Sequence, residues 1–376
     1  MGWVTAEQAL DRLGTKPQTL YANVSRGRIA AKPDPADTRR SLYSSEDVER
    51  LAARQQGRRR AETVAAQAID FGDPVLLTSI STIADGRLLY RGQDAAILSR
   101  DHDLGMVAEL LWGAQRVSFA TDVEQATGLG IAPAFVALGA MAGVALPTLG
   151  RSTIVLHRDG ATVVGILVSA LAGPGLEPVH LRLARHWQRP NAADLIRRAL
   201  VLLAEHELNA STFAARVAAS TGASLAATVL AGLATLSGPL HGGAAAAMRD
   251  LIAHAHRDGA DQAIRSALLS GRSLPCFGHR LYPNGDARAI ELAAHFALPA
   301  LYAELAEVGV AAVGEQPNID FMLAAMTSAY DLPADAPLIL FALGRSVGWL
   351  AHALEQVQTG TLIRPRAHYV GPAPLD

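Results

Sequence analysis

The sequence contains one cysteine, two lysines and few aromatic residues. Because Cys276 has no second thiol to pair with, an intrachain disulfide is excluded, and a reducing, cytoplasmic setting is expected. Lys16 and Lys32 are the only lysines, so arginine carries nearly all of the positive charge. Aromatic residues make up 5% of the 376 residues, whereas alanine dominates the apolar set, which favours helices over sheets. The N-terminus lacks the pattern of a signal peptide, so none is expected.

Charged residues are also scarce, at 18% of the chain, and they are unevenly distributed. Residues 1–60 carry 12 Lys and Arg against 7 Asp and Glu, a net charge of +5, whereas the remainder carries −7. This asymmetry predicts a small basic head and a larger acidic body with different partners. Two uncharged stretches, 128–149 and 217–248, are long enough to span a bilayer, but they consist of weakly apolar small residues. We interpret them as buried helices of a soluble protein.

The head, residues 1 to about 60, contains residues that typically begin and end short helices and form a β-turn. Thr5 and Gln8 form a capping-box pattern for a helix ending at Gly14, and Thr15 and Gln18 repeat that pattern before a helix that Gly27 ends. Residues 29–44 predict a strand, a turn and a return strand, after which Ser44 caps a third helix. The motifs "TAEQALDRLG" and "PQTLYANVSRG" resemble those of the winged helix-turn-helix heads of MerR and excisionase-type proteins.

That resemblance implies a DNA-binding surface on the head. The residues that would face the major groove are Lys16, Gln18, Thr19 and Asn23, and those near phosphates are Arg28, Lys32, Arg39 and Arg40. A surface module for protein contacts is the alternative, because a net charge of +5 is modest for a DNA reader.

The body is mostly helical in its pattern, apart from residues 152–170, which fit either a hairpin or two buried helix ends. Histidine, aspartate and arginine gather in short clusters within it. The main ones are "AEHELNAST" (204–212), "SGPLHGGA" (237–244), "FGHRLYPNGDAR" (277–288), "PNIDF" (317–321), "GRSVGW" (344–349) and "IRPR" (363–366). None has the spacing of a metal site, a phosphate-binding loop or a nucleophile elbow, so no metal and no cofactor is expected.

What remains is acid–base chemistry by His and Asp, with arginines to hold anions. An aspartate can take a proton from a weak carbon acid if neutral histidines stabilise the enolate by donating hydrogen bonds. Arginines suit a small dicarboxylate, which they can bind with two parallel hydrogen bonds.

The clusters, together with "LTSISTIADGRLLYRGQD" (77–94), resemble seven blocks of the citrate synthase family, in the family's order, over nearly all of residues 70–376. The resemblance implies that Asp320 is the base that deprotonates an acyl-CoA, and that His241 donates to its thioester oxygen. It implies that His279 donates to the ketone oxygen of oxaloacetate. The matches to the family's oxaloacetate and citrate ligands are His206, Arg288, Arg345 and Arg364. In the family the last of these reaches the neighbouring subunit's site, which implies a homodimer.

The resemblance fails mainly on the side of the site that holds CoA. The family has Gly where Cys276 stands, Lys or Arg at the position of Pro283, and Pro at that of Ala287. Loss of one phosphate contact at a partly exposed site is expected to cost about 1 kcal/mol, which weakens CoA binding without abolishing it. Cys276 is interpreted as a packed residue and not as a nucleophile.

The resemblance implies an acyltransferase that converts the acyl group into an alkyl group, joining oxaloacetate and acetyl-CoA into citrate, the reaction of the tricarboxylic acid cycle. Propionyl-CoA, giving 2-methylcitrate, stays open because one methyl group changes selectivity by about 1–3 kcal/mol. A second alternative is a non-catalytic regulator whose body senses a metabolite while the head reads DNA. The implied architecture has a head at 1–60, a large helical domain at 61–241 and 326–376, and a small helical domain at 242–325.

Overall fold

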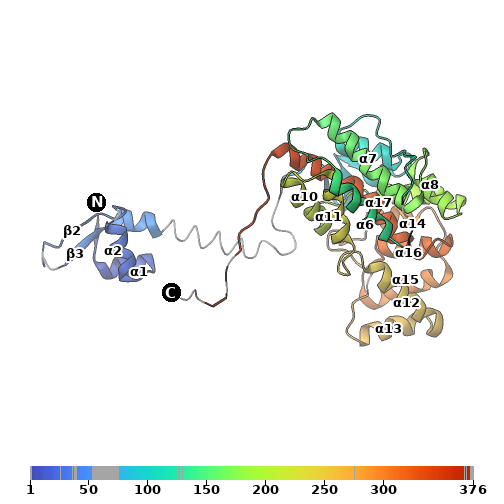
Figure 1. Ribbon diagram of the computed structural model, residues 1–376. Helices are drawn as coiled ribbons and strands as arrows, with labels where there is room; N and C mark the ends of the chain where they lie inside the picture. The colour runs from blue at the N-terminus through green and yellow to red at the C-terminus, as the bar shows by residue number, and fades with distance from the viewer. Residues whose placement is uncertain are drawn as a thin grey trace. The chain divides into compact units, whose positions relative to one another are not determined.

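The computed structural model describes residues 2–25, 27–35, 37, 40–52, 76–125, 128, 130–274, 276–367, 369 and 371–372. The chain divides into two compact units (Figure 1). Unit 1 comprises Met1–Leu77 and Arg366–Asp376, and unit 2 comprises Thr78–Pro365. The predicted boundary at residue 60 lies outside the described residues.

Unit 1 combines short helices with a three-stranded antiparallel sheet of order β1-β3-β2. Its named elements are β1 (Trp3–Val4), α1 (Ala6–Leu13), α2 (Pro17–Ser25), β2 (Ala31–Pro33) and β3 (Ser41–Ser44). A small apolar core that includes Leu13, Leu20 and Ile29 holds these elements together. Unit 1 therefore has a core of its own.

The local sequence patterns of unit 1 are confirmed with one exception. Thr5 and Gln8 form the predicted capping box, and Gly14 ends α1 in the left-handed region at φ 57°. The second capping box is wrong: α2 begins at Pro17, and the buried Thr15 hydroxyl has no hydrogen-bond partner within the described parts of the chain. The two strands predicted within 29–44 are present as β2 and β3. Val4, which no pattern predicted as a strand residue, pairs with Tyr43.

Unit 2 is helical apart from one small antiparallel sheet of order β4-β5-β6. Its strands are β4 (Ser81–Ala84), β5 (Arg87–Tyr90) and β6 (Gln93–Asp94). Its helices are α4 (Ala95–Leu98), α5 (Leu104–Trp112), α6 (Ala132–Val144), α7 (Thr153–Ala172), α8 (Val179–His186), the 3₁₀ helix η1 (Pro190–Ala192), α9 (Ala193–Leu203), α10 (Ala210–Ser220), α11 (Leu225–Leu236), α12 (Ala244–Asp258), α13 (Ala260–Leu269), α14 (Ala287–Ala293), α15 (Ala300–Val313), α16 (Ile319–Ala329) and α17 (Ala336–Thr359). The expectation of a mostly helical body is confirmed.

Helix α17 is the central element of unit 2, and α5, α7, α9, α10 and α11 pack around it. Close approach depends on small residues, because a Cβ at Gly348 would lie 2.4 Å from the Ala204 carbonyl oxygen. Helix α17 therefore passes directly against the end of α9, where the segment carrying His206 begins.

The small sheet fixes that same segment from the other side. The Tyr90 hydroxyl is buried within hydrogen-bond distance of the Val201 carbonyl (3.0 Å) and the Glu205 N–H (3.2 Å). The Glu207 carboxylate accepts the Ile83 N–H at 2.7 Å. His206 is thus held between two glutamates that the sheet binds.

Residues 152–170 form neither of the two arrangements that the sequence left open. They lie in one continuous helix, α7, which runs through Asp159 and Gly160 without a turn. A Cβ at Gly160 would lie 3.5 Å from the Trp112 ring, so the glycine serves helix packing and not a hairpin.

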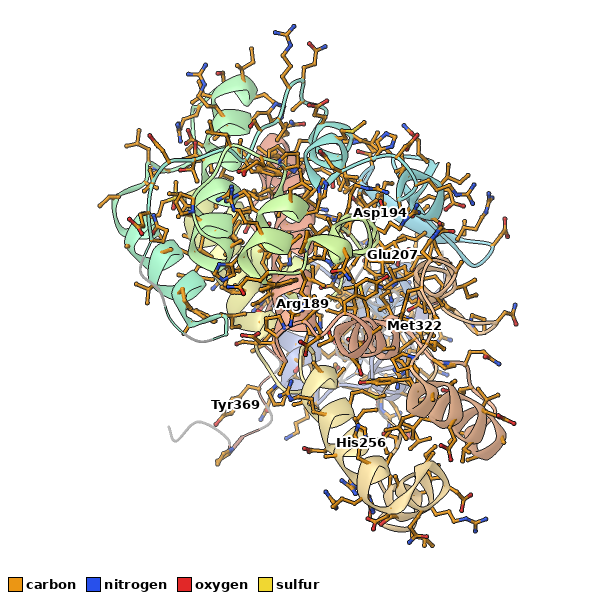
Figure 2. The ribbon with its side chains drawn as sticks, turned by 90° about the vertical axis from the view of Figure 1, so that its right-hand side faces the viewer. Arg189, Asp194, Glu207, His256, Met322 and Tyr369 are labelled. Atoms are coloured by element: carbon orange, nitrogen blue, oxygen red, sulfur yellow. The ribbon has the colours of Figure 1, made fainter. Side chains whose placement is uncertain are left out.

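Helices α12, α13 and α15 pack against one another at one end of unit 2 (Figure 1). Figure 2 shows His256, near the end of α12, farther out than Met322 on α16. These helices lie within 242–325, the range predicted as a small domain; the boundaries of that domain remain a prediction.

Two helices, α7 and α17, meet the length and composition expected of a membrane span. In the most apolar window of α17, 89% of the residues are buried inside the protein, compared with 50% for α7. Burial in unit 2 therefore accounts for the apolar character of α17. The two stretches that raised this question in the sequence contain the shorter helices α6 and α11.

Candidate active site

Six of the seven predicted site residues of the body lie at helix ends or in the loops between helices. His206 follows α9, His241 lies in the turn before α12, and His279 lies in the loop before α14. Arg288 and Asp320 are the second residues of α14 and α16, respectively. Arg345 is the exception, because it lies within the central helix α17.

Backbone hydrogen bonds join the loop that carries His279 to the segment before Asp320. The Asn318 N–H donates to the Cys276 carbonyl at 2.9 Å, and the Gly278 N–H donates to the Gln316 carbonyl at 2.8 Å. The Asn318 amide nitrogen also donates to the Gly278 carbonyl at 3.1 Å, while its oxygen accepts the Asp320 N–H at 3.0 Å. Asn318 therefore caps α16 and fixes His279 and Asp320 in one local framework.

The rings of His206, His279 and Tyr282 form a cluster. The two histidine rings lie edge to face with centroids 5.0 Å apart, and Tyr282 is 5.0 Å from His279. The buried His206 Nε2 is 3.1 Å from the Tyr282 hydroxyl. Burial, and then the charges of Arg288 and Arg345, hold the pKa of His206 well below its usual range. His206 is thus a neutral group at pH 7.

The tautomer of His279 follows from one hydrogen bond. The Leu281 N–H donates to His279 Nδ1 at 3.2 Å, so Nδ1 is an acceptor and the ring proton resides on Nε2. Burial, reinforced by the charge of Arg288, lowers the pKa of His279 to about 4. His279 therefore presents a neutral N–H donor at pH 7.

A buried ion pair joins Arg288 to Asp286. Arg288 Nε and Nη2 donate to the two carboxylate oxygens of Asp286 at 2.9 and 2.8 Å, and both side chains are nearly fully buried. The Ile319 N–H donates to the same carboxylate at 3.0 Å. Although burial acts to raise the pKa of Asp286, the charge and hydrogen bonds of Arg288 lower it. Asp286 therefore holds Arg288 and the start of α16 together.

Asp320 shows the opposite behaviour, because its pKa lies above the usual range. Burial raises the pKa of Asp320 to about 6, and the charges of Arg288 and Arg345 only partly oppose this effect. At pH 7 the carboxylate is ionised, and its pKa lies close to that pH. A general base needs both properties.

His241 lies against Ser211, the second residue of α10. His241 Nε2 is 2.9 Å from the Ser211 hydroxyl. Burial, and then the charge of Arg345, lower the pKa of His241 to about 4. His241 is therefore neutral at pH 7.

Arg345 is buried at the same site and donates from Nε to the Leu203 carbonyl at 3.1 Å. Its charge influences the pKa of His206, His241 and Asp320. The structure thus brings together six of the seven predicted residues of the body.

The remaining predicted residues are placed elsewhere. Arg364 is exposed in the coil after α17. In unit 1, Lys16, Gln18, Thr19 and Arg28 are exposed, and Arg40 pairs with Asp37 at 3.3 Å. Arg39 lies outside the described residues. Asn23 does not fit a groove-facing role, because it is 8% exposed and its amide donates to the Thr19 carbonyl.

The sequence reasoning missed three residues of the site as individuals. Tyr282 and Asp286 lie inside the quoted motif 277–288, and Ser211 lies inside the motif 204–212. A signal was available for Asp286, because an acidic residue just before a helix is an N-cap pattern. It accepts the Arg288 N–H at 3.1 Å.

Cys276 is packed, as expected. The residue is 3% exposed, its thiol lies 3.8 Å from the Ala244 carbonyl, and burial raises the pKa of the thiol well above the usual range. Its φ of 81° is in the left-handed region, which favours glycine, the residue at this position in the family that the sequence resembles.

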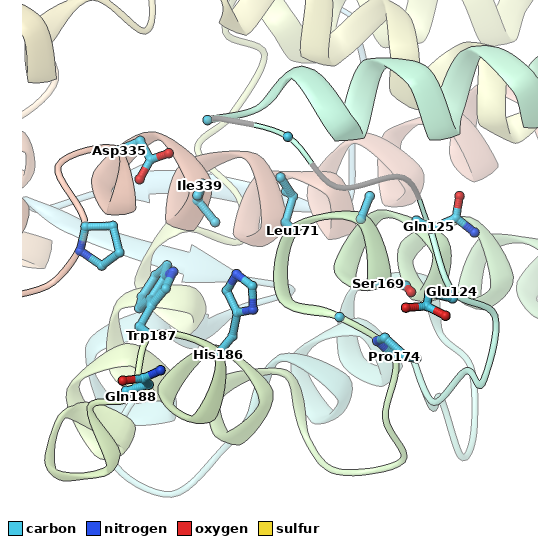
Figure 3. A pocket seen from close by; sticks show the side chains of 15 residues that line it. Glu124, Gln125, Ser169, Leu171, Pro174, His186, Trp187, Gln188, Asp335 and Ile339 are labelled. Carbon is cyan, nitrogen blue, oxygen red and sulfur yellow. The ribbon is translucent and has the colours of Figure 1, made fainter.

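A cavity of about 490 Å³ lies away from this cluster, between the ends of α7 and α8 and the start of α17 (Figure 3). His186, Trp187 and Asp335 are among the residues that line it and are labelled in Figure 3. None of the predicted site residues lines it. In the part of the chain that the structure describes, no group of three His, Cys, Asp or Glu side chains could hold a metal ion.

Comparisons of this chain with a family model and with the sequences of known proteins point to one family. Residues 168–366 match the family model described as citrate synthase, C-terminal domain. "Putative citrate synthase 2" of Mycobacterium tuberculosis is 39% identical over 214 residues, and "2-methylcitrate synthase 1" of Corynebacterium glutamicum is 36% identical over 200 residues. These alignments cover 52% and 48% of this chain, and the chain spans 57% and 51% of the two relatives.

Among solved structures, the citrate synthase of Thermoplasma acidophilum, in a ternary complex with carboxymethyl coenzyme A and oxaloacetate, superposes with a TM-score of 0.65. The superposition covers 83% of this chain and 97% of that one, at 24% identity. This likeness shows the fold.

We predict that Asp286→Asn lowers the free energy of unfolding by about 3–5 kcal/mol, because it leaves the buried Arg288 charge without its counter-ion. Asparagine still caps α14, so the change isolates the charge. Urea unfolding measures the effect. Asp261→Asn, which breaks an exposed pair with Arg265, is the matched control and is expected to leave the midpoint unchanged. Equal midpoints for the two variants would contradict the prediction.

Proposed function

Because the chain belongs to the citrate synthase family, we propose that it is an acyltransferase that condenses oxaloacetate with acetyl-CoA to give citrate and free CoA. The observation that carries this proposal is the arrangement around Asp320: one carboxylate with a raised pKa, two neutral histidines with lowered pKa values, and two buried arginines. A carbon acid needs such a base, and its enolate needs neutral donors.

In this mechanism Asp320 removes a proton from the methyl group of the acetyl thioester. Its carboxylate is ionised at pH 7, yet its raised pKa makes it a stronger base than an exposed aspartate. His241 donates a hydrogen bond to the thioester oxygen, where the negative charge develops. The new carbon–carbon bond then forms at the ketone carbon of oxaloacetate, and water hydrolyses the resulting thioester.

His279 is the donor to the ketone oxygen. Its proton on Nε2 is available because Nδ1 is occupied by the Leu281 N–H. A neutral donor stabilises an oxyanion without the prior cost of protonating a ring whose pKa is about 4.

His206, Arg288 and Arg345 are proposed to bind the two carboxylates of oxaloacetate. Both guanidinium groups are buried, and guanidinium groups bind carboxylates through charge-assisted hydrogen bonds. Acetyl-CoA and oxaloacetate are thus co-substrates, and the mechanism requires neither metal nor cofactor.

Propionyl-CoA is the second candidate acyl donor, which would give 2-methylcitrate. It is favoured by the Corynebacterium glutamicum relative, which bears the name 2-methylcitrate synthase and is 36% identical over the aligned part. The two substrates differ by one methyl group beside Asp320, so a direct comparison of rates decides between them.

We propose that residues 242–325 form a small domain that closes over oxaloacetate. His279, Arg288 and Asp320 belong to this range, whereas His206, His241 and Arg345 lie outside it. Closure would therefore complete the acyl-CoA site and exclude water.

A homodimer is part of the proposal, with Arg364 completing the site of the partner. Exposed apolar side chains occur where α6 ends and α7 begins, and Val144, Leu149 and Ile154 are 84%, 69% and 75% exposed. A second copy of the chain would cover this surface. The exposed position of Arg364 after α17 is compatible with a role across the interface.

The head is proposed to be a winged helix-turn-helix module, on the basis of α1, α2 and the β2–β3 pair. DNA binding would rest on the exposed Lys16, Gln18, Thr19 and Arg28. The regulator alternative needs no catalytic base, so the assay below separates it from the enzyme. For either function the expected location is the cytoplasm.

We predict oxaloacetate-dependent release of the CoA thiol from acetyl-CoA, from propionyl-CoA or from both, measured by thiol titration. Asp320→Asn should reduce the rate by about 10²–10⁴-fold, because it removes the base. Glu315→Gln, an exposed change five residues away, is the control. If the unaltered protein binds oxaloacetate but releases no thiol, the enzymatic proposal fails and the regulator is favoured.

We predict that kcat/KM for the acyl-CoA falls as the pH is lowered through about 6, by about tenfold per unit below that value. The sign follows from the base: protonated Asp320 cannot accept a proton, whereas His241 and His279 stay neutral down to about pH 4. A pH–rate profile between 4.5 and 8 tests this, and an acidic limb near 4 would contradict the assignment of Asp320.

We predict that mixing two inactive variants, Asp320→Asn and Arg364→Ala, restores about a quarter of the wild-type activity after the subunits exchange. Half of the randomly formed dimers then contain both chains, and one of their two sites combines an intact Asp320 with an intact Arg364. If Arg364 served its own chain, no activity would return.

A further inference from the structure

The chain after α17 leads to Arg364, and two hydrogen bonds hold it on the way. The Thr361 carbonyl accepts a hydrogen bond from the Gln356 side-chain amide at 2.8 Å. Two residues later, the Ile363 N–H donates to the Ser220 hydroxyl at 3.1 Å. Thr361 and Arg364 are exposed and Ile363 is half-buried, so these hydrogen bonds determine the path of the segment more than apolar burial does.

Arg216 determines which way the Gln356 amide faces. The guanidinium Nε–H can only donate, and it lies 2.9 Å from Gln356 Oε1, so this atom is the amide oxygen. The amide nitrogen therefore faces Thr361 and the Thr359 hydroxyl, which is 3.1 Å from it. Because Gln356 and Arg216 are both buried, water does not replace these contacts.

Arg216 and Ser220 both belong to α10, and they lie four residues apart on one face of it. Helix α10 packs against α17, and Arg216 Nη1 donates to the Glu355 carboxylate of α17 at 2.9 Å. The Ser220 hydroxyl donates to the Val217 carbonyl at 2.7 Å, which leaves its oxygen to accept from the backbone of the segment. One face of α10 thus holds the segment at both points.

We propose that Gln356 and Ser220 are positioning residues for Arg364, and that they act on the active site of the partner subunit and not on that of their own chain. Ile363 adjoins Arg364, so its hydrogen bond to Ser220 fixes the point from which the arginine side chain extends. The ligand is a carboxylate of oxaloacetate, as in the proposed function, on which this inference rests.

The same network also leads into the chain's own site, which gives the competing explanation. Arg216 Nη1 is 3.2 Å from His352 Nδ1, and His352 Nε2 is 3.2 Å from the carboxylate of Glu205. Glu205 directly precedes His206, a proposed oxaloacetate ligand. A disturbance of Arg216 would therefore act within one chain. Ser220 bonds to α10 and to the segment, so its substitution tests the anchor with the least disturbance of Arg216.

Ser220→Ala removes one anchor and leaves Arg216 in place. We expect KM for oxaloacetate to rise about 3- to 10-fold, the effect of one lost hydrogen bond, and kcat to change by less than about twofold. Ser270→Ala is the matched control and is expected to leave KM unchanged, because this serine, at the end of α13, donates to the Ala267 carbonyl at 2.8 Å in the same way. An unchanged KM in Ser220→Ala would overturn the proposal.

Subunit exchange decides whose site the anchor serves. Ser220→Ala is mixed with a roughly tenfold excess of Asp320→Asn, so that nearly every Ser220→Ala chain pairs with an Asp320→Asn chain. In such a dimer the site with the intact Asp320 receives Arg364 from the chain with the intact Ser220. We expect KM for oxaloacetate to return to the wild-type value once the activity of the excess variant alone is subtracted. A KM that stays raised would place the effect within one chain and refute the proposal.

Gln356→Met extends the test to the second anchor, because methionine keeps the length of the side chain and removes the donor to Thr361. We expect a raised KM for oxaloacetate and the same return to the wild-type value on mixing with Asp320→Asn. A KM that returns for Ser220→Ala and stays raised for Gln356→Met would overturn the role of Gln356, since its effect would then pass through Arg216 to its own chain's site.

A double-mutant cycle separates the failure of this inference from the failure of the proposed function. Calorimetric titration of oxaloacetate needs no turnover. Ser220→Ala should raise the dissociation constant in the otherwise unaltered protein and add nothing in the Arg364→Ala background, because it acts through that arginine. This result without any release of thiol would support the anchor and refute the condensing enzyme. Equal effects of Ser220→Ala in the two backgrounds would refute the anchor, whatever the activity.

Discussion

The carboxylate of Asp286 connects three parts of the candidate active site. It caps α14, accepts hydrogen bonds from Nε and Nη2 of Arg288, and accepts the Ile319 N–H at the start of α16. Since Asp320 follows Ile319 directly, the distance between the proposed base and the proposed carboxylate ligand depends on this one side chain. The positive charge of Arg288 is tolerated in a buried place because Asp286 neutralises it, and the charge of Arg345 lies near the buried Glu205.

Burial sets the chemistry of the other groups in the same direction, towards neutrality. It raises the pKa of Asp320 and lowers those of His206, His241 and His279, and the two arginines lower the histidine values further. The same low-polarity surroundings thus produce a stronger base and a set of neutral hydrogen-bond donors. An exposed aspartate would be a weak base at pH 7. Exposed histidines would be a mixture of neutral and protonated rings near that pH.

The second level of organisation concerns which atoms carry the protons. His279 receives its tautomer from a backbone N–H, which can only donate, whereas His241 Nε2 faces the Ser211 hydroxyl, which can donate or accept. The two histidines therefore have similar pKa values, and the backbone fixes the tautomer of His279.

Much of this protein could be predicted from local sequence. Thr5, Gly14 and the strands within 29–44 formed the expected elements because capping and turn chemistry act over a few residues. The order of the polar motifs indicated the family and six of the residues that meet at one site. Residues 152–170 were misjudged because the packing of α7 against neighbours such as Trp112 outweighed local preference. Thr15 was misjudged because α2 begins at Pro17 and the Thr15 hydroxyl does not cap it. Only the folded structure decided that Asn23 is buried, that Asp286 pairs with Arg288, and that Ser211 lies between Asn209, His241 and Trp349. These facts depend on distances between residues up to 138 positions apart, and a local pattern contains no information about such distances.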